Sequence, residues 1–289
     1  MTTTKLMKKM SFMLLWLSFS MTLLAQQKKL SMEDAIMAYQ HGLYPEQMYP
    51  VWRADSKTFT NFDFYNGDLK AISAQTANSE VLLNLTELNA SLKTANLVEL
   101  RMLYGYEWLP NGNLAITDNN QFIEYNPIAK SLVYTHVFDP KAENITRSVT
   151  GNFAYTIDNR LYVLTKEGKQ YSVSGDNVPD GIVYGQTVSR NEFGISGGIF
   201  WSPDGAKLAF YRKDETKVAQ YPLVDVSTRI ATPKNIRYPM AGMASEEITV
   251  GIFDMASATQ IVLNTTGTPE QYLTNLAWTN TADALLIAV

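Results

Sequence analysis

The chain has 289 residues, a length that suits one large domain or two of ordinary size. Apolar residues make up 46 % of it and charged residues 18 %, which is typical of a globular protein, and the net charge of −4 provides no basic field for nucleic acid or anionic lipid. Cysteine is absent and the only histidines are His41 and His136, so disulfides, zinc–thiolate sites and thiol nucleophiles are excluded, and we expect neither a metal nor a cofactor.

The first 25 residues have the pattern of a secretory signal peptide. Three lysines within residues 5–9 precede an apolar run from Met10 to Leu24, and the small residue Ala25 offers a cleavage point. The run is roughly 15 residues long, short of the ~20 that a membrane-spanning helix needs. We therefore expect export to the periplasm or the cell envelope, with an uncleaved membrane anchor as the alternative.

A short helix is predicted from Ser31 to His41, within an N-terminal helical segment that covers residues 26–48. Ser31 is a preferred N-cap residue, and Glu33 and Asp34 lie in the first turn, where the helix dipole favours negative charge. At the end of this helix, His41 is expected to interact with the terminal carbonyl groups.

Residues 49–289 are predicted to form a β-propeller. An aromatic residue, a tight turn and an alternating strand recur around Trp52, Trp108, Phe153, Trp201 and Trp278. The first four units are spaced by roughly 45–56 residues, a period typical of propeller blades, which bury their faces by stacking on one another. The predicted fold class is all-β: a partial, open propeller of about five four-stranded blades. A β-sandwich is the alternative.

The last residues of the chain, Leu285 to Val289, are an apolar strand with no partner after it. A propeller closes on itself to cover its edge strands. The sequence therefore predicts an incomplete propeller in a truncated chain.

Three stretches in the second half resemble the propeller of dipeptidyl peptidase IV and, more closely, that of its prolyl tripeptidyl peptidase relatives. They are GQTVSRNEFGI from Gly185, running on to WSP; FYRKDETKV from Phe210, leading to YPLVD; and RYPMAG from Arg237, followed by ITVGIF. Residues 31–184 match more loosely. The resemblance covers nearly the whole mature chain but only the front portion of the family's proteins.

The resemblance implies an exported serine peptidase that removes dipeptides or tripeptides from a free N-terminus, usually after proline. In this family an eight-bladed propeller covers an α/β-hydrolase domain, which carries the Ser-Asp-His triad and against which the early helix packs. The expected partners are thus the N-terminus of a peptide substrate, the missing α/β-hydrolase domain and, in the full-length protein, a second copy in a homodimer. No catalytic residue is expected in this chain, and no nucleic acid is expected as a partner.

Glu192 is the residue that we expect to bind the substrate. The α-amino group of a peptide has a pKa near 8 and is mostly cationic at neutral pH. A carboxylate in a partly dry pocket would hold it by a charge-assisted hydrogen bond worth roughly 1.5–3 kcal/mol. The dipeptidyl branch has two adjacent glutamates before Phe-Gly, whereas Asn191 takes the first position here, as in the tripeptidyl branch. The alternative is a solvated carboxylate, or one paired with Arg190.

Other patterns are interpreted as structural. The segment from Gly194 to Gly198 matches Gly-x-Ser-x-Gly around Ser196, but a nucleophile elbow needs a strand before the serine and a helix after it, and no histidine follows to complete a triad. Glu246 and Glu247 are expected in a solvated turn. Four aromatic residues are expected in the blade core: Trp108, Tyr162, Trp201 and Trp278.

The leading hypothesis is the N-terminal propeller portion of an exported prolyl di- or tripeptidyl serine peptidase, which gates access and binds the free N-terminus of the substrate. Because a serine nucleophile needs a base beside it, the chain alone is predicted to be inactive. A non-enzymatic propeller that binds a peptide or protein in the cell envelope is the alternative, and a hydrolase that uses Ser196 in an unrelated way is a third.

Overall fold

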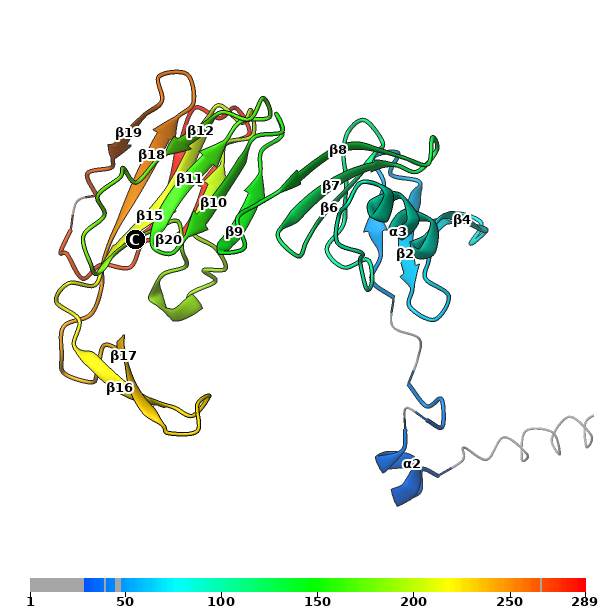
Figure 1. The fold of residues 1–289 in the computed structure, drawn as a ribbon, viewed down its shortest axis with the longest axis horizontal. Helices are drawn as coiled ribbons and strands as arrows, with labels where there is room; N and C mark the ends of the chain where they lie inside the picture. The colour runs from blue at the N-terminus through cyan, green and yellow to red at the C-terminus, as the bar shows by residue number, and fades with distance from the viewer. Residues whose placement is uncertain (1–28, 39, 45–47, 266) are drawn as a thin grey trace, which may run out of the picture. The chain divides into compact units, whose positions relative to one another are not determined.

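The computed structural model describes residues 29–38, 40–44, 48–265 and 267–289, so the predicted signal segment lies outside the described residues. The chain divides into two units between Pro50 and Val51. Figure 1 shows the elements of each unit, coloured along the chain. No helix in the described part of the chain is long and apolar enough to cross a membrane.

In the first unit the predicted helix is present but shorter than expected, as α2 (Met32–Ile36). Ser31 caps it as predicted: its Oγ accepts the Asp34 N–H at 3.0 Å, and Asp34 Oδ2 accepts the Ser31 N–H at 3.0 Å. The expected contact of His41 with terminal carbonyls is wrong. Because the helix ends well before this residue, the imidazole Nδ1 instead lies 3.0 Å from Asp34 Oδ1.

The second unit is built from antiparallel sheets that follow one another along the chain as blades. The first blade comprises β1 (Val51–Trp52), β2 (Thr58–Asp63), β3 (Asp68–Ser73) and β4 (Ser79–Asn84). The second comprises β5 (Glu107–Trp108), β6 (Leu114–Asp118), β7 (Gln121–Asn126) and β8 (Ser131–Val137). The third comprises β9 (Ala142–Arg147), β10 (Phe153–Ile157), β11 (Arg160–Leu164) and β12 (Gln170–Ser172).

The fourth blade is larger and carries an insertion. Its strands are β13 (Ile182–Tyr184), β14 (Ile199–Trp201), β15 (Lys207–Asp214), β18 (Glu247–Asp254) and β19 (Thr259–Val262). Between β15 and β18 the chain forms a separate two-stranded ribbon of β16 (Gln220–Asp225) and β17 (Thr232–Arg237) (Figure 1). A fifth blade begins with the hairpin of β20 (Thr274–Trp278) and β21 (Leu285–Ala288).

The prediction of an all-β, open propeller is confirmed. Each of the five repeated units forms an antiparallel hairpin, and the strands of the described residues form no closed barrel. In each hairpin turn, a backbone N–H donates a hydrogen bond to the carbonyl of the residue three positions earlier. The donor and acceptor residues are Ser56 and Arg53, Gly112 and Leu109, Gly151 and Ser148, Gly205 and Ser202, and Ala282 and Thr279. The local sequence of each turn therefore sets the start of each blade.

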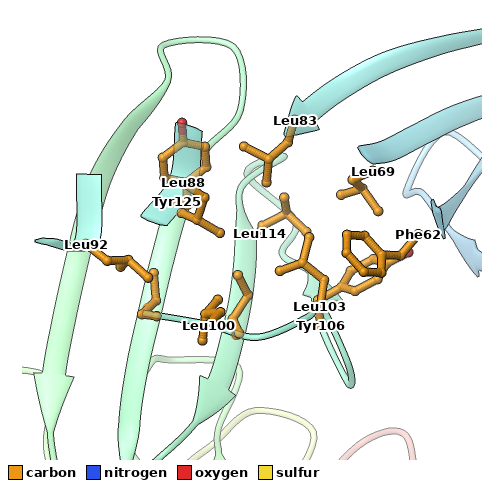
Figure 2. Close-up of a cluster of buried hydrophobic side chains, with 12 residues drawn as sticks. Phe62, Leu69, Leu83, Leu88, Leu92, Leu100, Leu103, Tyr106, Leu114 and Tyr125 are labelled. Carbon is orange, nitrogen blue, oxygen red and sulfur yellow. The ribbon is translucent and has the colours of Figure 1, made fainter. Parts of the chain in front are cut away.

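A helix that was not predicted, α3 (Leu85–Thr94), fills the space between the first two blades. Asn84 caps it, because its Oδ1 accepts the Thr86 N–H at 2.9 Å. Leu88 and Leu92, one turn apart on its buried face, are both 0 % exposed. Figure 2 shows these two leucines within a cluster of apolar side chains from both blades and from the segment between α3 and β5: Phe62, Leu69, Leu83, Leu100, Leu103, Tyr106, Leu114 and Tyr125.

Three of the repeated tryptophans, Trp108, Trp201 and Trp278, lie at the interfaces between blades, as expected for core residues, whereas Trp52 of the first unit is 58 % exposed. Trp108 Nε1 donates to Thr60 Oγ1 of the first blade at 2.9 Å, and Trp278 Nε1 donates to the Phe200 carbonyl of the fourth blade at 3.0 Å. Trp201 is partly buried against the cluster between the third and fourth blades, and Tyr162 packs against the cluster between the second and third. In each case an aromatic residue joins neighbouring sheets.

Candidate functional site

The candidate site is a loop that interrupts one edge strand of the fourth blade. β13 pairs with residues 212–214 of β15, and β14 pairs with residues 208–210 along the same edge, so the two strands are parts of one edge strand. Between them, residues 185–198 leave the sheet and return. Tyr211 closes this excursion at its base, because its N–H donates to the Gly198 carbonyl at 3.0 Å and its carbonyl accepts the Gly185 N–H at 2.9 Å.

The two ends of the loop approach each other so closely that one of them must be glycine. A Cβ at Gly198 would lie 2.2 Å from the carbonyl oxygen of Gln186, and 2.6 Å from the carbonyl carbon of Gly185. Both atoms belong to the backbone and cannot move aside as a side chain would. Gly198 therefore allows the loop to close on itself.

The stem of the loop is buried and its tip is exposed. Val188 and Ile195 are 1 % and 5 % exposed, and both pack in a cluster with Tyr211 and Leu273. Residues 190–194 between them are exposed. Burial raises the pKa of Tyr211 to about 12, which reflects how dry this cluster is. The tip is thus presented to solvent from a rigid apolar base.

The backbone of the tip is unusual. Ser189, Arg190, Asn191 and Phe193 have φ values of 50°, 55°, 61° and 56°, in the left-handed region that side chains other than glycine rarely adopt. Glu192 is itself extended, with φ −80° and ψ 171°. Conformations of this kind persist only where the surroundings hold them, and they concentrate at active sites and ligand clamps.

Backbone hydrogen bonds fix the position of Glu192 within this tip. The Asn191 N–H donates to the Val188 carbonyl at 3.1 Å, and the Glu192 N–H donates to the Ser189 carbonyl at 2.9 Å. The Glu192 carbonyl in turn accepts the Ile195 N–H at 3.1 Å. The carboxylate of Glu192 is therefore exposed while its backbone is held on both sides, and it can bind a cationic group without moving the chain.

Aromatic and cationic side chains lie on the residues that flank Glu192 in the tip. The Arg190 guanidinium lies 4.7 Å from the centre of the Tyr238 ring. Hydrogen bonding to Tyr238 raises the pKa of Arg190, and the charges of Glu192 and Glu246 add to the effect. Phe193 lies 4.8 Å from Tyr272 between ring centres, and the two residues are 55 % and 56 % exposed. The tip thus places a carboxylate beside exposed aromatic surface.

The prediction of a solvated turn at Glu246 and Glu247 is wrong. Glu246 is half-buried, and its Oε1 accepts the N–H of Ser189 at 2.7 Å. Glu247 begins β18 and its Oε1 accepts a hydrogen bond from Lys217 Nζ at 2.6 Å. No local pattern predicts the contact between Glu246 and Ser189, because the two residues are 57 positions apart.

Ser196 does not lie in a nucleophile elbow. It is exposed and lies outside any helix or strand, and the next element is β14 rather than a helix. An elbow presents its serine on a sharp turn from a strand into a helix, which this segment lacks. Within the described ranges no cluster of three or more histidine, aspartate or glutamate residues could hold a metal ion.

Comparison with known proteins gives a consistent result. Residues 106–289 match the family described as "Dipeptidyl peptidase IV (DPP IV) N-terminal region". Two proteins named "Probable dipeptidyl-aminopeptidase B", from Talaromyces marneffei and Talaromyces stipitatus, are 27 % and 26 % identical over 157 residues. These matches cover 46 % of this chain and 17 % of each fungal protein, so the chain spans a small part of their length.

Solved structures share the fold. A Bacteroides ovatus protein assigned as a dipeptidyl aminopeptidase IV is 36 % identical, with a TM-score of 0.70 over 83 % of this chain and 34 % of that one. Porphyromonas gingivalis dipeptidyl peptidase 4 is 16 % identical, with a TM-score of 0.67 over 90 % of this chain and 38 % of that one, and this second likeness is one of fold alone.

Proposed function

The chain belongs to the family of dipeptidyl peptidase IV N-terminal regions, and we propose that it serves an exported prolyl di- or tripeptidyl serine peptidase as the propeller that gates access and binds the free N-terminus of the substrate. The observation that carries the proposal is Glu192: an exposed carboxylate at the tip of a loop whose backbone is fixed from both sides. The other proposed parts of the assembly are the α/β-hydrolase domain with the catalytic triad and, in the full-length protein, a second copy of the chain.

The chemistry of the tip suits an α-ammonium group. Because Glu192 is exposed rather than in a dry pocket, an ion pair between its carboxylate and an α-ammonium group gains about 0.2–1 kcal/mol, which is about 1.5- to 5-fold in affinity. The exposed rings of Phe193 and Tyr272 offer apolar surface beside it for the first side chains of a peptide. Because Asn191 precedes Glu192, only one acidic side chain is present at this position to bind the α-ammonium group. Its place would determine how many residues of the peptide extend from the bound N-terminus toward the catalytic serine.

Export is proposed on the pattern of the first 25 residues, with lysines ahead of an apolar run and a small residue after it. The family's function in removing N-terminal di- or tripeptides is compatible with a location in the periplasm or cell envelope. A fusion of residues 1–25 to a reporter that folds only after export would test this part of the proposal.

The binding proposal can be tested with the full chain and a tetrapeptide amide, Ala-Ala-Pro-Ala, prepared with a free and with an acetylated N-terminus. We expect saturation-transfer NMR titrations to give an affinity about 1.5- to 5-fold higher for the free peptide. Glu192→Gln should remove this preference, whereas Glu99→Gln, at another exposed acidic residue, should preserve it. Equal binding of the two peptides by the unaltered chain would contradict the proposal, and so would a preference that survives Glu192→Gln.

A further inference from the structure

One carboxylate reaches the site loop from a distant part of the chain. Glu246 lies in the segment between β17 and β18, and its Oε1 accepts the Ser189 N–H at 2.7 Å. We propose that Glu246 is a positioning residue, which holds the turn of residues 189–191 in the conformation that presents Glu192. The proposal rests on the binding function inferred above for Glu192, but the hold on the turn can be measured separately.

The contact acts on Glu192 through a single residue. The N–H of Ser189 donates to Glu246, and the carbonyl of Ser189 accepts the N–H of Glu192 at 2.9 Å. A hydrogen bond to an ionised carboxylate is shorter and stronger than one between neutral groups, and it polarises the peptide group that joins Val188 to Ser189, whose carbonyl accepts the Asn191 N–H at 3.1 Å. Glu246 therefore holds Ser189 in place on one side, while the carbonyl of Ser189 holds the N–H of Glu192 on the other.

The turn has a strained backbone that depends on its contacts. Three consecutive residues from Ser189 to Asn191 have positive φ, an arrangement that L-residues seldom keep for more than one position. Ser189 is 8 % exposed, and its Oγ has no hydrogen-bond partner among the described residues. Without Glu246 the Ser189 N–H would be a buried donor with no acceptor, so the turn would rearrange to reach water.

The same segment holds the turn at a second point. Tyr238, which directly follows β17, lies under the guanidinium of Arg190 at 4.7 Å. Residues 238–246 therefore contact the turn through a ring on the side chain of Arg190 and through a carboxylate on the backbone of Ser189. The two contacts hold the neighbouring residues Arg190 and Ser189. Together they would fix the direction in which the side chain of Glu192 leaves the turn.

Three variants of Glu246 in the full chain separate its possible roles. Glu246→Gln keeps an acceptor oxygen at the same reach but removes the charge. Glu246→Asp keeps the charge but shortens the reach, and Glu246→Ala removes both. Glu247→Ala is the matched control, since this neighbouring carboxylate contacts Lys217 and not the turn.

Two measurements are made on each variant: amide hydrogen exchange at Ser189 and Glu192, followed by NMR, and the affinities for Ala-Ala-Pro-Ala amide with a free and with an acetylated N-terminus. We expect Glu246→Ala and Glu246→Asp to raise the exchange rates by about tenfold or more and to abolish the preference for the free peptide, with no change in the affinity for the acetylated peptide. Glu246→Gln keeps a neutral hydrogen bond, so its exchange rates should lie between those of Glu246→Ala and the unaltered chain, and Glu247→Ala should match the unaltered chain in both measurements.

Unchanged exchange at Ser189 in Glu246→Ala would overturn the proposal. The opposite order, with Glu246→Asp retaining affinity and Glu246→Gln losing it, would also overturn it, because the charge rather than the backbone contact would then matter. If the unaltered chain does not distinguish the two peptides, the proposed function of Glu192 fails, while the exchange rates still decide whether Glu246 holds the turn.

Discussion

The hydroxyl of Tyr211 is the clearest point at which to test how the fourth and fifth blades are joined beneath the site loop. It donates to the carbonyl of Leu273 at 2.8 Å, and the two residues are 1 % and 0 % exposed. Tyr211→Phe keeps the ring and removes only this donor. The carbonyl of Leu273 is then left in a dry cluster without the bond.

The expected loss follows from that burial. A buried polar group that loses its partner costs about 1–3 kcal/mol of unfolding free energy. For a domain of this size each 1 kcal/mol lowers the melting temperature by about 2–4 °C. The control is Tyr272→Phe, because the side chain of Tyr272 is 56 % exposed and its hydroxyl can be solvated. We expect a change within about 0.5 kcal/mol for the control.

The pH dependence gives a second, independent measure. Burial raises the pKa of Tyr211 to about 12 from a model-peptide value of 10.0, so the folded state favours the protonated hydroxyl. The stability that this group contributes is complete below pH 10 and is lost as the pH rises through 12. At pH 11 the expected loss is about 1.4 kcal/mol. The phenylalanine variant lacks this loss, so its stability deficit should shrink by the same amount.

Urea unfolding of both variants and the unaltered chain at pH 8 and at pH 11 measures these differences directly. A loss of unfolding free energy in Tyr211→Phe no larger than that in Tyr272→Phe at pH 8 would refute the buried hydrogen bond. An equal deficit of Tyr211→Phe at both pH values would also refute it, because the hydroxyl would then not be buried as the structure has it.

Three further outcomes are expected. Leu88→Ala, at a fully buried position of α3, should lower the unfolding free energy by about 3–5 kcal/mol in urea titrations. The control Val98→Ala, at a residue that is 56 % exposed, should lower it by less than about 0.5 kcal/mol, and equal losses would contradict the packing of α3. Gly198→Ala should lower the unfolding free energy by about 1–3 kcal/mol or more in the same assay, because its Cβ would lie 2.2 Å from a backbone oxygen. Gly197→Ala, with open space around it, should leave the unfolding free energy nearly unchanged. An unchanged stability in Gly198→Ala would refute the close approach of the loop ends. Finally, the full chain should not cleave Xaa-Pro or Xaa-Xaa-Pro chromogenic amides, and turnover that Ser196→Ala abolishes would overturn the interpretation of that serine as structural.

The sequence was most informative where structure is local. The cap at Ser31 and the five hairpin turns depend on residues within a few positions of each other, so their patterns predicted them correctly. The helix α3 carried the same kind of signal, with a cap at Asn84 and leucines at helical spacing, but it is short and lies between strand-like runs. Its burial between two blades, rather than its intrinsic preference, stabilises it.

The sequence by itself determined the repeat and the all-β fold class, and its resemblance to the family led to the proposal for Glu192. Only the tertiary structure decided that β13 and β14 share one edge of β15, that the loop between them closes at Tyr211, and that Glu246 accepts the N–H of Ser189. The physical reason is separation along the chain: a hydrogen bond between residues 57 positions apart leaves no periodic or local pattern, because it forms only when distant strands have already been brought together.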